Sequence, residues 1–194
     1  MKVINLFGAP GAGKSTVAAG LYHLMKAEGL IVEFAQEYAK ELVWAHAGGM
    51  PGETPPAMRD QLSIFAEQNR RLERIRDHVD YVVTDSPLLM SSIYAPENYP
   101  RSFHGFVLDM FRTYDNVNFF LERIIPYQNT GRLHTEEQSQ LLGASMSLRL
   151  QEWHIPFEGL PGGAEAPENI LNRILNRKTC TRAEATIVPL RASA

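Results

Sequence analysis

The sequence predicts an α/β fold: a five-stranded parallel sheet with helices on both faces and a short lid. Three observations support this prediction: five short apolar runs, amphipathic helical patterns between them, and a glycine-rich turn directly after the first run. Parallel strands need crossover connections and are buried on both faces, so they read as continuous apolar runs separated by helices. Ligands of such sheets bind at the carboxyl ends of the strands, so chemistry is expected there.

The expected elements alternate along the chain. Strands are expected over residues 2–7, 30–35, 80–85, 116–121 and 153–157. Helices are expected over residues 15–28, 37–46, 58–78, 103–111, 135–151 and 169–178. Thr135 and Gln138 form a capping box at the start of one helix, because each side chain can satisfy a main-chain N–H of the other residue. Glycines and prolines mark residues 48–56 and 159–167 as loops.

The length, composition and charge of the chain limit the classes of protein to which it can belong. The chain has 194 residues, enough for one domain, which is expected over residues 1–178, followed by a tail at 179–194 that is either disordered or a stray strand. No apolar run approaches the length of a membrane span. The single cysteine, Cys180, excludes an internal disulfide framework and a thiolate zinc site, so a cytoplasmic protein is expected. The net charge of −3 gives no global attraction to nucleic acid, although a local basic patch is compatible with it.

One motif specifies chemistry. Residues 8–15 match G-x-x-x-x-G-K-[ST] and lie between a strand and a helix, as a P-loop requires. Glycines let main-chain N–H groups turn toward phosphate oxygens, and the helix N-terminus adds a positive dipole. The expected donor-binding residues are Gly8, Ala9, Pro10, Gly11, Ala12, Gly13, Lys14, Ser15 and Thr16. Lys14 is expected to reach the β- and γ-phosphates and the Ser15 hydroxyl to ligate Mg²⁺, whereas Thr16 either touches the α-phosphate or fills the helix start.

Two carboxylates follow strands near this loop. Asp85 ends the third strand and is expected to hold Mg²⁺, directly or through water. The alternative for Asp85 is an N-cap or a turn, which Asp-Ser-Pro suits well. Glu37 follows the second strand and is expected to accept a proton if the acceptor is a hydroxyl, the alternative being an ordinary glutamate in a first helical turn. The sequence leaves open which of the two is the base.

A polar segment over residues 123–134 is the candidate lid. Its arginines, Arg123 and Arg132, follow the fourth strand and are expected to stabilise charge on the transferring phosphoryl group. The alternative is a solvent-exposed loop. A second loop, over residues 159–165, is a candidate for cradling adenine through backbone contacts. The six histidines are scattered without metal-ligand spacing.

The acceptor side is expected on the long helix that begins at Met58. Gln68 and Arg71 share one face of this helix and are positioned to pair with a base edge. The other arginines of the helix are at least as well explained by a solvated face on which glutamates balance them. Tyr99 lies in a cluster with two prolines that either stacks on an acceptor ring or forms a rigid connector.

These residues together resemble the nucleoside/nucleotide-kinase branch of P-loop proteins. More closely, most of the chain resembles the nicotinamide-riboside-kinase domain attached to a bacterial NAD regulator. The resemblance includes the P-loop, Glu37-Tyr38, Val83-Thr84-Asp85 and the segment Pro126-Tyr127…Gly131-Arg132. That family has a tryptophan near the position of Tyr127, which indicates a different acceptor pocket. The chain lacks the switch region and arginine-finger partner of a GTPase and is too short for a usual AAA+ module.

The opening residues 1–8 and the phrase at residues 94–99 also resemble small bacteriophage P-loop kinases. Some of that group are similar to kinases that phosphorylate 5-hydroxymethyluracil already in DNA. If the chain is phage-encoded, it is expected in the host cytoplasm.

The resemblance implies transfer of the γ-phosphate of Mg·ATP to a hydroxyl of a nucleoside-type acceptor. The leading acceptor is a 5-hydroxymethyl-pyrimidine, in DNA or as a nucleotide; nicotinamide riboside or a nucleoside monophosphate comes next. ATP and Mg²⁺ are the expected cofactors, and a monomer or homodimer without a membrane partner is expected. A function of another class is an ATPase switch with a protein partner, in which Glu37 would orient water. The sequence leaves the acceptor, the donor base and the oligomeric state open.

Overall fold

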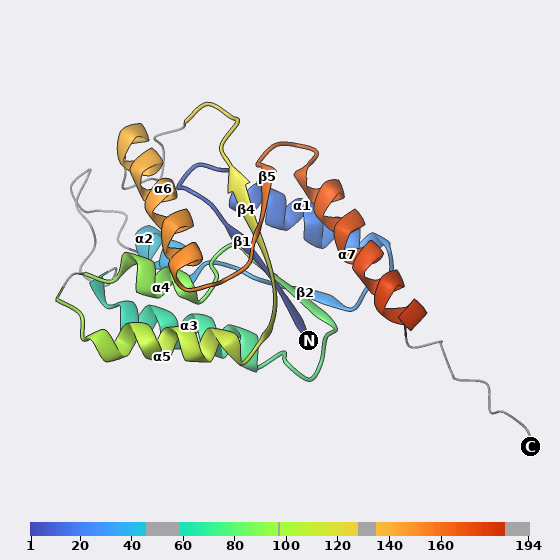
Figure 1. Ribbon diagram of the computed structural model, residues 1–194, viewed down its shortest axis with the longest axis horizontal. Coiled ribbons are helices and arrows are strands. Elements are labelled where there is room, and N and C mark those ends of the chain that lie inside the picture. The colour runs from blue at the N-terminus through green and yellow to red at the C-terminus, as the bar shows by residue number, and fades with distance from the viewer. Residues whose placement is uncertain (46–58, 97, 128–134, 185–194) are drawn as a thin grey trace, which may run out of the picture.

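Five parallel strands form one sheet in the order β2-β3-β1-β4-β5 (Figure 1). The computed structural model describes residues 1–45, 59–96, 98–127 and 135–184. The strands are β1 (Lys2–Phe7), β2 (Val32–Ala35), β3 (Tyr81–Thr84), β4 (Asp115–Glu122) and β5 (Glu158–Pro161). The helices are α1 (Lys14–Ala27), α2 (Tyr38–Ala45), α3 (Gln61–Glu73), α4 (Leu89–Tyr94), α5 (Arg101–Arg112), α6 (Glu136–Glu152) and α7 (Ala166–Glu184). The predicted fold, a five-stranded parallel sheet covered on both faces, is confirmed.

The central strand β1 separates two apolar layers. Ile4 and Leu6 point into a core completed by α1 and α7, whereas Val3 and Phe7 point into a core completed by α3, α4, α5 and α6. Figure 1 shows α1 and α7 side by side on one face of the sheet and α3 and α5 on the other. Burial of each such side chain contributes roughly 1.5–3 kcal/mol, and a one-residue slip would exchange the two faces. The register of β1, and with it the position of the turn that follows, is therefore strongly specified.

A buried row of amides links β1 to β4 and to the approach of β5. The Asn5 amide donates to Oδ1 of Asn116 at 2.8 Å and to Oδ1 of Asn118 at 3.0 Å. The Asn118 amide donates to the Pro156 carbonyl at 2.9 Å. Buried polar groups are tolerated when they have partners, so this network supports the strand alignment without a large penalty.

The predicted position of the fifth strand, residues 153–157, is wrong. Residues 153–155 close α6 instead, with the Ile155 N–H donating to the Leu150 carbonyl at 2.9 Å. His154 has a φ of 57°, a left-handed conformation that ends a helix and cannot continue a strand. The strand follows at 158–161 on the sheet edge, where Pro161 is compatible with strand pairing because one side of an edge strand is unpaired.

Other boundaries differ from those expected. Helix α4 was not predicted, because it has only six residues and its buried positions, Leu89, Met90, Ser91 and Ser92, are consecutive rather than spaced with a helical period. Helix α3 ends at Glu73 rather than at residue 78, and α7 continues past residue 178 to Glu184. The capping box of Thr135 and Gln138 is confirmed. The predicted loop at 48–56, most of the lid and the last ten residues lie outside the described residues. No helix within the described ranges is long and apolar enough to cross a membrane.

Candidate active site

The turn between β1 and α1 has the backbone geometry of an anion cradle. Gly8, Gly11 and Gly13 have φ values of 145°, 84° and 83°. Gly13 is the N-cap of α1 in the left-handed region, and a Cβ on Gly8 would lie 2.6 Å from the Leu121 carbonyl oxygen. The first turn of α1 contains no acidic residue, so its positive N-terminal dipole is not offset locally. The N–H groups at a helix N-terminus have no partner within the helix, and together with this dipole they favour phosphate oxygens at the turn.

The Lys14 side chain lies across this turn. Its ammonium donates to the Gly8 carbonyl at 2.8 Å and to the Ala9 carbonyl at 3.1 Å. Ser15 and Thr16 follow in the first turn of α1 and are exposed. The residues predicted to bind the donor are thus brought together, with a cation and two hydroxyls at the mouth of the cradle.

A second glycine-rich turn, after β5, packs against the cradle. The Gly162 N–H donates to the Glu122 carbonyl at 2.7 Å, and a Cβ on Gly162 would lie 2.2 Å from the Ala12 carbonyl oxygen. Ile124 and Ile125 are exposed beside these turns, and Ile125 Cδ1 lies 3.9 Å from a Cβ built on Gly13. Sequence reasoning missed both isoleucines, because two apolar residues after a strand carry no periodic signal. Adenine binding by the 159–165 loop stays a prediction, and Gly162 of this loop does pack against the turn between β1 and α1.

Replacing Gly162 with alanine is expected to destabilise the protein by about 2–3 kcal/mol, because the clash is with main chain that cannot move without distorting the cradle. The measurement is urea unfolding of both forms. The matched control is Gly105→Ala in α5, where an added Cβ meets nothing within 4 Å. That change is expected to stabilise by about 0.5–1 kcal/mol through helix propensity. Equal changes in the free energy of unfolding for the two substitutions would contradict the close packing of Gly162 against Ala12.

The two predicted carboxylates lie at the ends of adjacent strands. Asp85 directly follows β3 and is 4% exposed, and its Oδ1 accepts a hydrogen bond from the Glu37 N–H at 3.1 Å. Because β1, β2 and β3 run parallel and β3 lies between the other two, Asp85 and Glu37 lie at the carboxyl ends of the strands, as does the turn that follows β1. The N-cap alternative for Asp85 is wrong, since α4 begins at Leu89 and its N-cap is Leu88.

Gln68 is held by the main chain on both sides of Glu37. Its Oε1 accepts from the Tyr38 N–H at 3.1 Å, and its Nε2 donates to the Gln36 carbonyl at 3.3 Å. The same Nε2 lies 3.4 Å from Thr84 Oγ1, and the side chain is buried. The amide of Gln68 is therefore engaged with protein groups in this structure. Its predicted contact with an acceptor base stays a prediction.

Arg71 links α3 to the same segment. Its guanidinium donates to the Gln36 carbonyl at 3.0 Å, pairs with Glu41 at 2.8 Å and lies over the Tyr38 ring at 5.2 Å. Its side chain is 13% exposed, so these contacts account for much of its surface. A direct acceptor contact by Arg71 stays a prediction.

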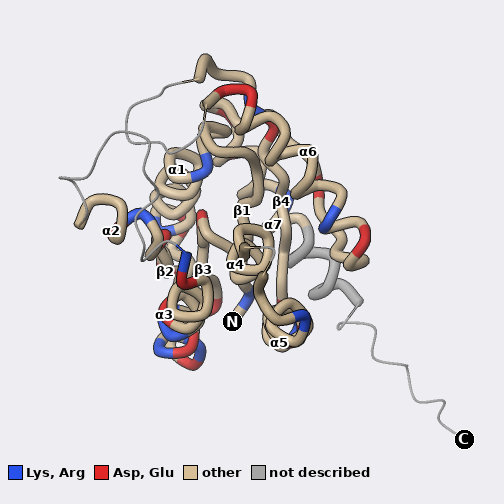
Figure 2. Tube along the Cα trace, turned by 90° about the vertical axis from the view of Figure 1, so that its left-hand side faces the viewer, with Lys and Arg blue, Asp and Glu red and all other residues tan. Residues whose placement is uncertain are grey.

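The other charges of α3 and of the residues just after it pair with one another, as expected for the solvated face that is the alternative interpretation of these arginines. Arg70 pairs with Glu67 at 2.8 Å and Arg76 with Glu73 at 3.0 Å. The Arg70 guanidinium lowers the pKa of Glu67 below its usual value. Figure 2 shows basic and acidic positions next to one another along this helix. Alternating signs of this kind reduce the net positive potential that a nucleic acid would meet.

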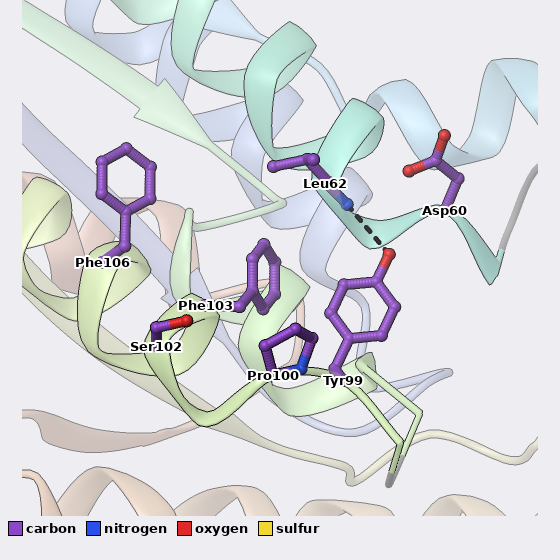
Figure 3. A pocket seen from close by; sticks show the side chains of 7 residues that line it. All are labelled: Asp60, Leu62, Tyr99, Pro100, Ser102, Phe103 and Phe106. Carbon is purple, nitrogen blue, oxygen red and sulfur yellow. Dashed lines mark hydrogen bonds between the residues drawn. The ribbon is translucent and has the colours of Figure 1, made fainter.

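Two tyrosines lie in the segment that joins α4 to α5: Tyr94 is the last residue of α4, and Tyr99 precedes α5. Burial, and after it the charge of Glu37, raise the pKa of Tyr94 above its usual value. Tyr99 lines a pocket of about 500 Å³ between the start of α3 and α5 (Figure 3). Its hydroxyl donates to the Arg59 carbonyl and accepts from the Leu62 N–H, both at 3.3 Å. Stacking of Tyr99 on an acceptor ring stays a prediction.

The described part of the lid starts at Arg123. Its guanidinium pairs with Glu136, the first residue of α6, at 2.7 Å and lies 5.4 Å from the centre of the Tyr127 ring. Arg132 lies outside the described residues. Within the described ranges, no group of three or more His, Cys, Asp or Glu side chains is arranged to hold a metal ion. The oxygen donors of Ser15 and Asp85 are of the kind that Mg²⁺ takes alongside phosphate oxygens.

The fold and the cradle define a P-loop protein. Residues 3–166 match the model of the family described as an AAA domain, and the chain belongs to this family. The description of this family names an AAA domain, whereas the chain is shorter than a usual AAA+ module. No curated protein matches the chain.

Solved structures share the architecture. Deoxyadenosine kinase from M. mycoides with bound dATP has a TM-score of 0.52 and 17% identity, with 91% of this chain and 100% of that chain covered. The NadR protein in complex with NR has a TM-score of 0.61 and 19% identity. That match covers 87% of this chain and 50% of the NadR chain, so this chain corresponds to half of NadR. The predicted likeness to the nucleoside-kinase branch of P-loop proteins is thus supported at the level of fold.

Proposed function

We propose that the protein is an ATP-dependent kinase that transfers the γ-phosphate of Mg·ATP to a hydroxyl of a nucleoside-type acceptor. The observation that carries this proposal is the position of Glu37 and Asp85 at the carboxyl ends of adjacent strands, where the Asp85 carboxylate accepts a hydrogen bond from the Glu37 main-chain N–H at 3.1 Å. A hydroxyl acceptor must lose a proton, which a carboxylate can take, whereas a phosphate acceptor is already anionic. The folds of a deoxyadenosine kinase and of NadR with NR support an acceptor of the nucleoside type.

The proposed reaction uses these groups in distinct ways. The acceptor oxygen forms a bond to the γ-phosphorus while the bond to the β,γ-bridging oxygen breaks; ADP leaves, and the hydroxyl proton passes to Glu37. Lys14 and the N–H groups of the cradle stabilise negative charge on the phosphates, and Arg123 and Arg132 add to this from the lid. Ser15 and Asp85 would hold Mg²⁺, which neutralises charge on the β- and γ-phosphate oxygens when bound.

The acceptor is proposed by class. A 5-hydroxymethyl-pyrimidine, in DNA or as a nucleotide, is the leading candidate from the sequence, ahead of nicotinamide riboside and a nucleoside monophosphate. The ion pairs of Arg70, Arg71 and Arg76 with glutamates favour a free nucleoside or nucleotide over DNA. A cytoplasmic location, in the host cytoplasm if the chain is phage-encoded, is part of the same proposal.

The acceptor class is tested by ADP release with and without each candidate. One class is expected to raise the rate at least about tenfold, because phosphoryl transfer waits for a positioned hydroxyl. If that acceptor is duplex DNA with 5-hydroxymethyluracil, its KM rises steeply with salt; for a free nucleoside it changes little. A KM for DNA that does not move with salt would contradict the polymeric version.

The second candidate is an ATPase switch with a protein partner, which the AAA description of the family favours. In that case water is the acceptor and Glu37 orients it. ADP release that no acceptor increases would support this candidate and count against the kinase.

A further inference from the structure

One face of α6 is directed at the phosphate cradle. Glu136, Ser139 and Gly143 are spaced by three and four residues, so they lie in one row along the helix. Ser139 is fully buried, and its hydroxyl donates to the Pro10 carbonyl at 2.6 Å, across 129 residues of sequence. The Ser139 side chain is thus hydrogen-bonded to the main chain in the middle of the P-loop.

The same row brings the helix backbone close to the loop. A Cβ on Gly143 would lie 3.0 Å from the Ala9 Cβ and 3.7 Å from its Cα. Glycine in the interior of a helix is destabilising. The close approach of Gly143 to Ala9 explains why a residue without a side chain stands at this position of α6. At the start of the row, Glu136 pairs with Arg123, where the lid begins.

The carbonyls of the loop receive donors from two different elements. Lys14 donates to the carbonyls of Gly8 and Ala9. Pro10 has no N–H to offer a phosphate, and its carbonyl is bonded by Ser139 instead. When the Lys14 ammonium moves to phosphate oxygens, its bonds to the loop are lost, whereas the bond from α6 does not depend on Lys14.

We propose that Ser139 is a positioning residue for the donor phosphates. Its bond to Pro10 holds the loop in the shape that aims N–H groups at the nucleotide, and α6 links this shape through Glu136 to the Arg123 end of the lid. The inference rests on the proposed binding of Mg·ATP and adds to it a determinant outside the P-loop motif.

The test compares affinity for Mg·ATP by calorimetry with thermal unfolding of the nucleotide-free chain. Ser139→Ala is expected to weaken Mg·ATP binding about five- to tenfold, the size of one hydrogen bond that fixes a ligand site. Gly143→Ala is expected to change the unfolding temperature little, because the higher helix propensity of alanine offsets the cost of the 3.0 Å contact with the Ala9 Cβ. The same contact displaces Ala9 and is expected to weaken Mg·ATP binding. The matched control is Ser145→Ala on the exposed side of α6, with unchanged affinity.

The outcomes separate the inference from the proposed function. If the wild-type chain does not bind Mg·ATP, the proposed function fails. If wild type binds and both α6 variants bind equally well, the role of Ser139 is overturned. It is also overturned if Gly143→Ala lowers affinity only in proportion to a lowered unfolding temperature, since that result indicates packing alone. Weaker binding by both variants, with the unfolding temperature of Gly143→Ala close to that of wild type, supports it.

Discussion

Lys14→Ala is expected to lower kcat/KM for phosphoryl transfer about 10³-fold, or about 4 kcal/mol of transition-state stabilisation. The reason is that the ammonium lies over the cradle, bonded to the carbonyls of Gly8 and Ala9, where the β- and γ-phosphates are expected. Steady-state kinetics with saturating Mg²⁺ measure the effect. Because Lys14 belongs to an ordered turn with many other contacts, urea unfolding is expected to show a much smaller change than the kinetics.

The matched control for this substitution is Lys26→Ala in the last turn of α1. Lys26 forms an exposed ion pair with Glu33 at 3.2 Å, remote from the cradle. Exposed pairs of this kind contribute roughly 0–1 kcal/mol, so activity is expected to stay near that of wild type. Activity of Lys14→Ala within tenfold of wild type would contradict the role of the P-loop lysine.

Glu37→Gln is expected to reduce kcat by about 10²–10⁴-fold while leaving affinity for Mg·ATP unchanged. The amide cannot accept the proton of the acceptor hydroxyl, whereas the main-chain N–H groups of Glu37 and Tyr38 keep their bonds to Asp85 and Gln68 after the substitution. Single-turnover kinetics together with nucleotide binding separate the two effects. Glu33→Gln, on the surface of β2, is the control and is expected to behave as wild type.

Asp85→Asn provides the contrast. Asparagine keeps a side-chain oxygen that can accept the Glu37 N–H, but it lacks the charge expected to hold Mg²⁺. The Mg²⁺ concentration for half-maximal activity is therefore expected to rise, and excess Mg²⁺ to restore part of the rate. If Glu37→Gln and Asp85→Asn show the same Mg²⁺ dependence, the division of roles between the two carboxylates is wrong.

The conformation of the turn between β1 and α1, where donor binding is proposed, could be predicted because its signals are local. The P-loop occupies eight successive residues whose conformation follows from glycines and a helix start. Asp85 and Glu37 could be placed because parallel strands expose their carboxyl ends at one edge, although their direct contact depends on β2 and β3 being neighbours. Strand order is set by packing between distant segments, which a single sequence does not display.

Long-range contacts explain what sequence reasoning missed. Ser139 donates a hydrogen bond to the Pro10 carbonyl, and Gly162 packs closely against Ala12. In both pairs the two residues are more than a hundred positions apart in the sequence, so neither contact leaves a local signal. Gln68 and Arg71 were expected at an acceptor base because of their helical face, yet their polar groups contact the main chain around Glu37. The fifth strand was predicted at residues 153–157, but residues 153–155 end α6 instead. His154 has the left-handed backbone conformation that terminates this helix.

The most direct test of the account is to follow labelled γ-phosphate from Mg·ATP in the presence of each acceptor. The acceptors are free nucleosides including nicotinamide riboside, nucleoside monophosphates, and duplex DNA with and without 5-hydroxymethyluracil, with Lys14→Ala as the blank. The account predicts label on a hydroxyl of one nucleoside-type acceptor, in amounts equal to the ADP formed. Label found only in inorganic phosphate, at a rate that no acceptor changes, would contradict it.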